Sequence, residues 1–150
     1  MAVDGKYKQC QDDKFISMTE VGWRQFWKVV LDGVYEINTV ILYNQVNYHS
    51  EQLSNVNIYV YDFGGKRSLC ANTGNMKNVY IKEFKCKAGA IGNVVMLSKS
   101  SRGSIRLCEV VVYGDKGKFI RRVFSIDRYR RLTMKLLIVT LCFQQKCLKN

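Results

Sequence analysis

The chain has 150 residues, of which 47% are hydrophobic and 24% are charged, as in an ordinary soluble globular protein. This length allows one domain with a hydrophobic core, plus a tail. The net charge of +12 is unevenly divided: residues 1–115 have 14 Lys+Arg against 11 Asp+Glu, and residues 116–150 have 10 against 1. Residues 1–115, which we call the body of the chain, are only mildly basic. We therefore expect no nucleic-acid binding by this part.

Residues 1–26 are polar and irregular, and candidate strands rich in β-branched and aromatic residues follow. Asp32-Gly33, between the first two candidates, predicts a tight hairpin turn. Later linkers, such as Asp62-Phe-Gly-Gly-Lys66, are also rich in turn residues. Short strands at roughly regular spacing predict an all-β sandwich or jelly roll. The candidate strands are 27–31, 34–43, 56–61, 79–87, 93–98 and 106–113.

The sequence changes character after Gly114. Residues 116–131 form a basic run, and residues 132–143 form an apolar stretch that contains Lys135 and is shorter than the ~20 residues of a membrane span. We therefore predict a domain over 1–115 and a basic C-terminal tail over 116–150. The tail is either an extension foreign to the domain or a segment that contacts anionic surfaces.

Six cysteines are present, none in a CxxC pattern, and four of them lie in the body: Cys10, Cys70, Cys86 and Cys108. Such an even number suits disulfides and an oxidising compartment. The N-terminus has no apolar signal region. The cysteines therefore predict an extracellular location, as a secreted protein or an ectodomain. Since no signal region is present, this location implies that the chain lacks its natural beginning.

A series of segments follows one order along the chain. The segments are Ala2-Val-Asp-Gly5, Phe26-Trp-Lys-Val-Val-Leu31, Val34-Tyr-Glu-Ile37, Val40-Ile-Leu-Tyr-Asn44, Gln52-Leu-Ser-Asn-Val-Asn-Ile-Tyr-Val60, Phe84-Lys-Cys86 and Leu107-Cys-Glu-Val-Val-Val112. Together they resemble the F-type lectin (fucolectin/tachylectin/pentraxin-related) domain, a discoidin-like β-sandwich or jelly roll. The resemblance covers about residues 2–113, and it implies that a first strand is missing before residue 2.

The resemblance implies two disulfides, Cys70 with Cys86 and Cys10 with Cys108. It also implies a structural calcium ion between the Asp-Gly loop and the last strand. Asp4 and Glu109 would then contribute carboxylates and Cys108 its main-chain carbonyl, which are the hard oxygen ligands that calcium prefers.

The sugar site is where the chain departs from the family. The positions that match the two fucose-binding arginines are Gln45 and Gln52, and the early histidine has no match. Glutamine lacks the fixed fork and the charge of a guanidinium, so the usual fucose site is degenerate. The candidate sugar-binding residues are Gln45, Asn47, His49 and Gln52, with Tyr48 or Trp23 as packing surfaces.

These observations predict a non-catalytic, extracellular carbohydrate-binding module whose partners are glycans or glycoproteins. The alternative is a structural or adhesion module of a larger receptor-like protein that binds no sugar. A third hypothesis is association of residues 116–135 with nucleic acid or anionic membrane. An enzyme is not expected, because His49 is the only histidine and no nucleophile or phosphate-loop motif accompanies it.

Overall fold

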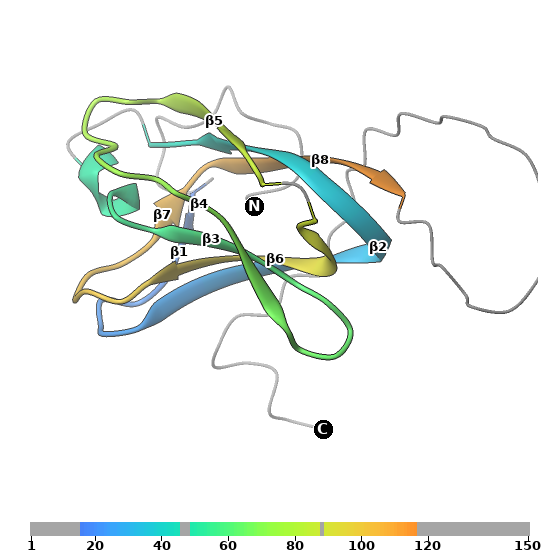
Figure 1. The fold of residues 1–150 in the computed structure, drawn as a ribbon. Coiled ribbons are helices and arrows are strands. Elements are labelled where there is room, and N and C mark those ends of the chain that lie inside the picture. The colour runs from blue at the N-terminus through green and yellow to red at the C-terminus, as the bar shows by residue number, and fades with distance from the viewer. Residues whose placement is uncertain (1–15, 46–48, 88, 117–150) are drawn as a thin grey trace, which may run out of the picture.

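Strands make up nearly all of the regular structure in this computed structural model, which describes residues 16–45, 49–87 and 89–116. All strand pairs in these residues are antiparallel, and the predicted all-β sandwich is confirmed (Figure 1). The elements are β1 Ser17–Met18, β2 Gln25–Tyr43, the 3-10 helix η3 Ser50–Leu53, β3 Asn57–Tyr61, β4 Arg67–Asn72, β5 Ile81–Lys85, β6 Ile91–Lys99, β7 Arg106–Leu107 and β8 Glu109–Lys116.

The long strand β2 contributes to both layers of the sandwich. Its first part pairs with β6, so that Gln25 lies opposite Lys99. Its second part pairs with β8 along one edge and with β5 along the other, and Tyr43 lies opposite Glu109. The sheet with the order β4-β3-β6-β2-β5 therefore turns at β2 into a second layer that contains β8 (Figure 1).

The hairpin predicted at Asp32-Gly33 is wrong, because β2 runs through these residues without a break. Gly33 is not among the glycines with a positive φ, which a two-residue hairpin turn would require. Instead, the register with β6 shifts between Val30 and Tyr35. Such an irregularity bends a strand, and here it carries β2 from one layer to the other.

Two strands lie where none was predicted, and one predicted strand is split. β4 was expected to be linker, and β1 lies in the segment expected to be irregular. Cys70 is the only fully buried residue of β4, which lies at the edge of the sheet, so its sequence carries little of the apolar pattern by which strands are recognised. The segment predicted over 106–113 is divided into β7 and β8.

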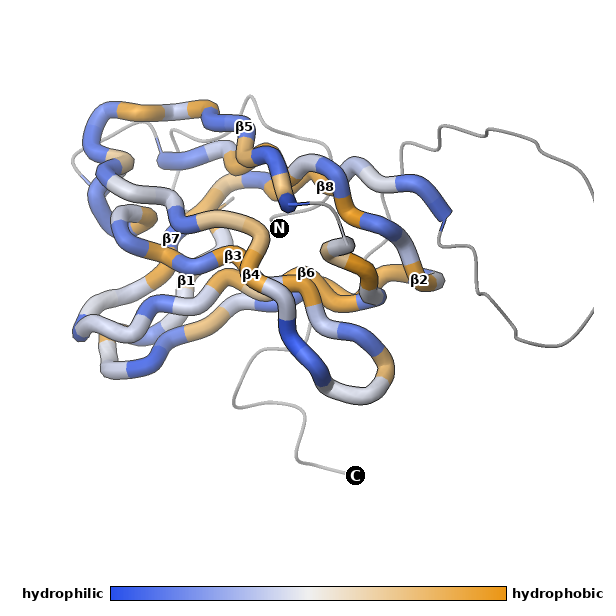
Figure 2. The backbone as a smooth tube through the Cα atoms, viewed as in Figure 1, coloured by the Kyte–Doolittle hydropathy of each residue, from blue (hydrophilic) through white to orange (hydrophobic). Residues whose placement is uncertain are grey.

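The core lies between the layers and is filled by alternate residues of the strands. Trp27, Val29 and Leu31 of β2 are buried together with Val95 and Leu97 of β6. Figure 2 shows hydrophobic residues along both of these strands. Burial of every second side chain is the pattern of a sheet with one face toward the core.

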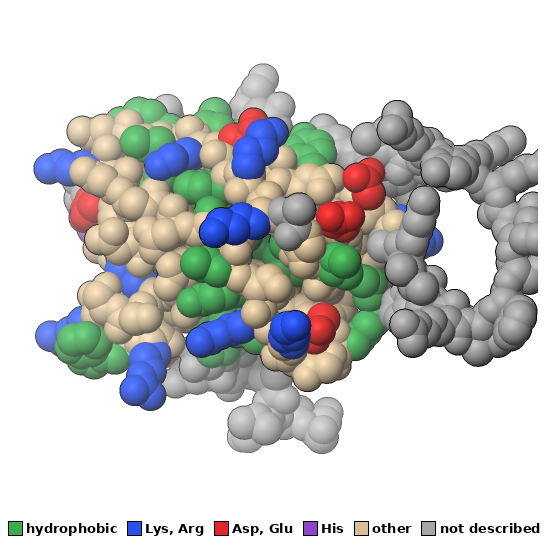
Figure 3. All heavy atoms as spheres, viewed as in Figure 1, with side chains coloured by type: hydrophobic (Ala, Val, Ile, Leu, Met, Phe, Trp, Pro, Cys, Tyr) green, Lys and Arg blue, Asp and Glu red, His purple; other side chains and the backbone are tan. Residues whose placement is uncertain are grey.

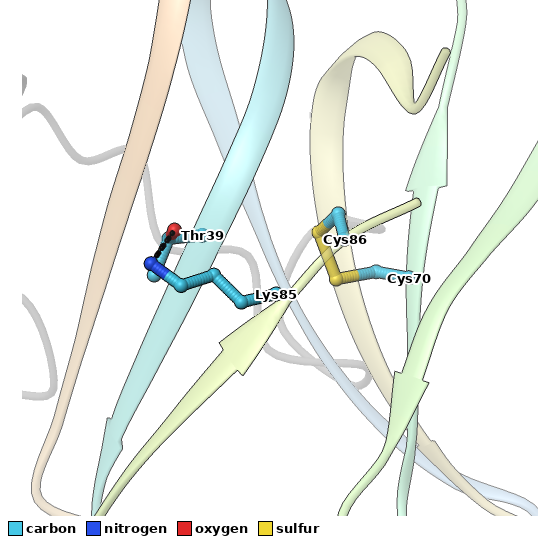
Figure 4. Close-up of a disulfide and its surroundings, with 4 residues drawn as sticks. All are labelled: Thr39, Cys70, Lys85 and Cys86. Atoms are coloured by element: carbon cyan, nitrogen blue, oxygen red, sulfur yellow. Dashed lines mark hydrogen bonds between the residues drawn. A yellow bond between two sulfur atoms is a disulfide. The ribbon is translucent and has the colours of Figure 1, made fainter. Parts of the chain in front are cut away.

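A disulfide between Cys70 and Cys86 is present, which confirms that pairing. Cys70 belongs to β4, an outer strand of one layer, and Cys86 directly follows β5 in the other layer (Figure 4). Lys85, the neighbour of Cys86, reaches back to Thr39 of β2 with 3.5 Å between Lys85 Nζ and Thr39 Oγ1. The disulfide thus joins the two layers covalently.

The tail prediction cannot be compared with the fold, because residues 117–150 lie outside the described residues. β8 continues to Lys116, so the domain limit at 115 and the role of residues 116–150 stay predictions. Within the described residues, no helix has the length and apolar character that a membrane crossing needs.

Candidate functional site

The loop that follows β2 is fixed from inside by Asn44. This side chain is buried and its Nδ2 donates to the main-chain carbonyl oxygens of Ser50 at 2.8 Å and Val79 at 3.0 Å, with Met76 at 3.2 Å. Its Oδ1 accepts the Gln45 amide N–H at 2.9 Å. Buried polar groups need such partners, and here they tie the predicted sugar loop to residues 76–79.

Gln45 does not lie at the surface, although its position matches one of the family's arginines. Its exposed fraction is 0%. A side chain without exposed surface does not touch a ligand directly unless the loop over it opens. Gln45 is therefore buried, and Asn47, the next candidate, lies outside the described residues.

His49 and Gln52 are the two described candidates that reach the loop end of the sandwich. The His49 carbonyl accepts the Gln52 amide N–H at 3.0 Å at the start of η3. The Gln52 side-chain oxygen accepts the main-chain N–H of Ser104 at 3.4 Å and its hydroxyl at 3.3 Å. The amide that replaces the second arginine is thus already engaged with the loop before β7, and any sugar contact by His49 or Gln52 stays a prediction.

Lys99 also supports this turn, a role that was not predicted from the sequence. Its buried side chain donates from Nζ to the Gln52 main-chain oxygen at 2.7 Å. Burial lowers the pKa of Lys99, and the nearby Glu51 carboxylate acts in the opposite direction. A lysine in a Ser-Lys-Ser-Ser loop normally faces solvent, so only the fold identifies it as a support for η3.

An open hollow lies at this end of the sandwich, where β2 begins and β6 ends. It has a volume of about 760 Å³ and is lined by Trp23, Arg24, Ser98 and Ser100. Trp23 is 69% exposed, which is unusual for so large an apolar side chain. In Figure 3, at the lower left, Lys and Arg side chains lie next to an apolar patch at this corner. Of the predicted packing surfaces, Trp23 is therefore accessible, and Tyr48 lies outside the described residues.

The main chain beside the hollow is fixed by an antiparallel bridge between Gly22 and Gly103. The amide of each donates to the carbonyl of the other, at 3.0 Å and 2.9 Å. Thr19 continues this ribbon: its amide donates to the Ile105 carbonyl, and its hydroxyl oxygen accepts the Ile105 amide, both at 3.0 Å. These bonds place Trp23 and Arg24 next to the loop 99–104 on a defined backbone.

The predicted calcium ligands are only partly within the described residues. Glu109 at the start of β8 has an exposed fraction of 0%, and Cys108 before it is also buried. A buried carboxylate beside a main-chain carbonyl suits the hard oxygens that calcium binds. In the described parts of the chain, however, no three His, Cys, Asp or Glu side chains form a metal-binding group. Asp4 lies outside them, as does Cys10, the predicted disulfide partner of Cys108.

Comparison with known proteins links this fold to lectins. No protein-family profile matches the chain. A fucolectin of Anguilla anguilla is 32% identical over 95 residues, which is 61% of this chain and 60% of that protein. Among solved structures, the lectin domain of lectinolysin, in complex with Lewis b antigen, superposes with a TM-score of 0.67 at 19% identity, over 75% of this chain and 81% of that one. A Streptococcus pneumoniae fucose binding module, SpX-3, gives a TM-score of 0.64 at 25% identity, over 75% and 81%.

These similarities confirm the resemblance to F-type lectins and the discoidin-like β-sandwich. The matched region spans about 60% of the eel fucolectin, so the relation concerns the sandwich rather than the whole of that protein. The chain thus has a lectin-like, discoidin-type fold, and the change at the family's fucose-binding positions stays a prediction.

Proposed function

We propose that this protein is a non-catalytic, extracellular carbohydrate-binding module whose sugar site has moved away from the two positions that hold arginine in the F-type lectins. Gln45 is buried and the Gln52 oxygen is bonded to Ser104. Neither side chain offers the paired donors of a guanidinium to a sugar. Among the described residues, the hollow at Trp23 is a surface that stays open to a ligand.

The exposed ring of Trp23 is the observation that carries this proposal. It is 69% exposed at the edge of an open hollow that also has the Ser98 and Ser100 side chains in its lining. A rigid aromatic face offers a large contact area at a small entropy cost, and hydroxyl groups both donate and accept hydrogen bonds. A pyranose ring, with one apolar face and polar edges, fits such a lining.

Glycan-array binding of the full chain tests the proposal. We expect binding to at least one class of glycan, and Trp23→Ala should weaken it by about tenfold or more, since this ring would supply most of the apolar contact. Phe63→Ala is a matched control, because Phe63 is also 69% exposed but lies in the turn between β3 and β4. Absence of binding to every glycan by a folded chain would refute the proposal.

A structural or adhesion module is the second candidate, and the engaged state of Gln52 favours it. If loss of both arginines removed sugar binding altogether, the sandwich would serve as a spacer or a protein-contact domain. Such a module would bind a protein partner with the same affinity in the presence of excess free sugar. Binding that free sugar displaces would exclude this alternative.

We also propose that a structural calcium ion binds Asp4, Glu109 and the Cys108 carbonyl. Support comes from the chemistry of the buried pair: the Glu109 carboxylate and the adjacent Cys108 carbonyl are hard oxygen ligands of the kind that calcium prefers. Thermal unfolding with added calcium and with a chelator tests this. Calcium should raise the Tm of the parent but not of Glu109→Gln, whereas an equal Tm in calcium and chelator would refute the site.

The extracellular location rests on the Cys70–Cys86 disulfide, since such bonds persist mainly in oxidising compartments. Free-thiol labelling of the protein isolated from its source tests this. These two cysteines should resist labelling until a reductant is added, and labelling without reductant would contradict the assignment.

A further inference from the structure

The lining of the hollow at Trp23 contains a positively charged residue as well as an aromatic one. Arg24 lines it, and Arg102 lies in the adjoining loop next to Gly103, which bridges Gly22. Within the described parts of the chain, neither arginine forms an ion pair or a hydrogen bond. Arg24 therefore brings a guanidinium group without an acidic partner to the hollow that Trp23 also lines.

The backbone at Arg24 supports a role for this side chain. Its φ is +56°, in the left-handed region that a residue other than glycine adopts at a cost. Such conformations gather at ligand-binding sites, where the surrounding structure maintains them. Here the Gly22–Gly103 bridge on one side and the Gln25–Lys99 pair on the other fix the chain around Arg24.

The other cation of this region is not available to a ligand. Lys99 points into the domain, and its ammonium is bonded to the Gln52 carbonyl at 2.7 Å. Among the described residues, the acidic ones next to these segments are Glu20 and Glu51, both exposed, and the Glu51 charge acts on Lys99. Arg24 is therefore the positively charged residue in the lining of the hollow, and Arg102 adds a second positive charge in the adjoining loop.

From these features we infer that the hollow binds a sugar that carries an anionic group, either a carboxylate or a sulfate. This inference rests on the proposed carbohydrate-binding function and specifies the ligand class. The ring of the sugar packs on Trp23, its hydroxyls meet Ser98 and Ser100, and its anionic group accepts paired N–H donors from Arg24. Arg102 adds attraction for the same charge.

Glycans that share a lactose core and differ in the acidic group attached to it provide the test, with one neutral fucosylated glycan beside them. The full chain is titrated with 3′-sialyllactose, with 3′-sulfated lactose and with lactose, and with the Lewis b tetrasaccharide as a neutral fucosylated glycan. We expect one acidic member to bind about tenfold more tightly than lactose, because hydrogen bonds to charged groups are the stronger ones. Which of the two acidic sugars binds separates a carboxylate from a sulfate ligand.

Substitutions then assign the charge selectivity to the hollow. Arg24→Gln keeps the β-carbon, so the backbone strain is unchanged, and it should remove most of the preference for the acidic sugar. Arg24→Lys should keep only part of this preference, because lysine has the positive charge but lacks the planar guanidinium with its paired N–H donors. Arg67→Gln is the matched control: it removes the same charge from β4, near the other end of the strands. A preference that survives Arg24→Gln would come from elsewhere, such as the basic residues 116–150, and would overturn the inference.

The outcomes separate this inference from the proposed function. Binding of lactose or the Lewis b tetrasaccharide with no preference for the acidic sugars overturns the anionic ligand but leaves a carbohydrate-binding module. Absence of binding to all four sugars and to a broad glycan array overturns both.

Discussion

Single polar side chains fix the backbone where this fold departs from regular strands. Tyr35 is buried after the bend in β2, and its hydroxyl donates to the Asp32 carboxylate at 2.6 Å. Asn44 and Lys99 fix the loop after β2 in a similar way, because each side chain donates a hydrogen bond to a main-chain oxygen of this loop. These contacts could not be read from the sequence, because each joins residues whose proximity depends on how β2 bends and where η3 lies.

Tyr35→Phe should lower the free energy of unfolding at neutral pH by about 0.5–1.5 kcal/mol, the usual value of one hydrogen bond. The bond to Asp32, burial and the charge of Asp32 raise the pKa of Tyr35 from 10.0 to about 12. Because the folded-state pKa is the higher one, the stabilisation is complete below pH 10 and is lost as the pH rises from 10 to 12.

Urea unfolding of the parent and of Tyr35→Phe across this pH range measures the effect. The difference between the two proteins should shrink between pH 10 and 12. Tyr113→Phe removes a more exposed hydroxyl of β8 and should change the stability by less than about 0.5 kcal/mol. A constant difference between parent and Tyr35→Phe would contradict the assigned hydrogen bond.

Lys99→Met should loosen η3 with little effect on the whole domain. The variant leaves the Gln52 carbonyl without its donor, but it also removes a buried ammonium, so we expect a net change within about 1 kcal/mol. Hydrogen exchange of the Gln52 and Ser54 amides, which bond within this turn, should be faster. Lys66→Met at an exposed position is the control. Unchanged exchange in Lys99→Met would show that Lys99 does not support the turn.

The strands that contribute several residues to the core were predicted from the sequence, and the strand that contributes only one was not. β6 and the second half of β2 bury every second or third residue, and both were predicted. β4 buries only Cys70 completely and was missed. The Asp32-Gly33 pair favoured a hairpin locally, but the pairing of β2 with β6 and then with β8 stabilises the extended strand. Long-range pairing therefore overrides a local turn preference.

The contact of β6 with β3 leads to a prediction for Gly92. A β-carbon there would collide with the Tyr61 carbonyl oxygen and would lie 2.8 Å from Val60 Cγ1. Since the backbone of β3 cannot move without disturbing its pairing with β4, Gly92→Ala should destabilise the domain by about 1–3 kcal/mol or more.

Chemical denaturation of Gly92→Ala measures this cost. Gly64→Ala is the control, because its added β-carbon meets only the Asp62 side chain at 3.4 Å in an exposed turn. The control should stay within about 0.5 kcal/mol of the parent. Equal stability of the two variants would show that β6 does not approach β3 as closely as described.

The two layers of the sandwich are joined to each other in two ways. β2 joins the layers by running through both, and the Cys70–Cys86 disulfide joins β4 to the end of β5. The resemblance to F-type lectins predicted this disulfide as well as the fold. It did not predict the hollow at Trp23 and Arg24, because the position of these residues beside the loop 99–104 depends on the bridge between Gly22 and Gly103.

Removal of the disulfide should therefore destabilise the whole domain. The two cysteines are 16 residues apart, and in the chain-entropy model the closure of such a loop contributes about 3 kcal/mol. The Cys70→Ala/Cys86→Ala variant should consequently unfold at a Tm roughly 10 °C or more below that of the parent. Treatment of the parent with reductant should lower its Tm by at least as much, since the predicted Cys10–Cys108 bond would also open. If the variant melts at the temperature of the parent, the pairing along β2 alone holds the two layers together.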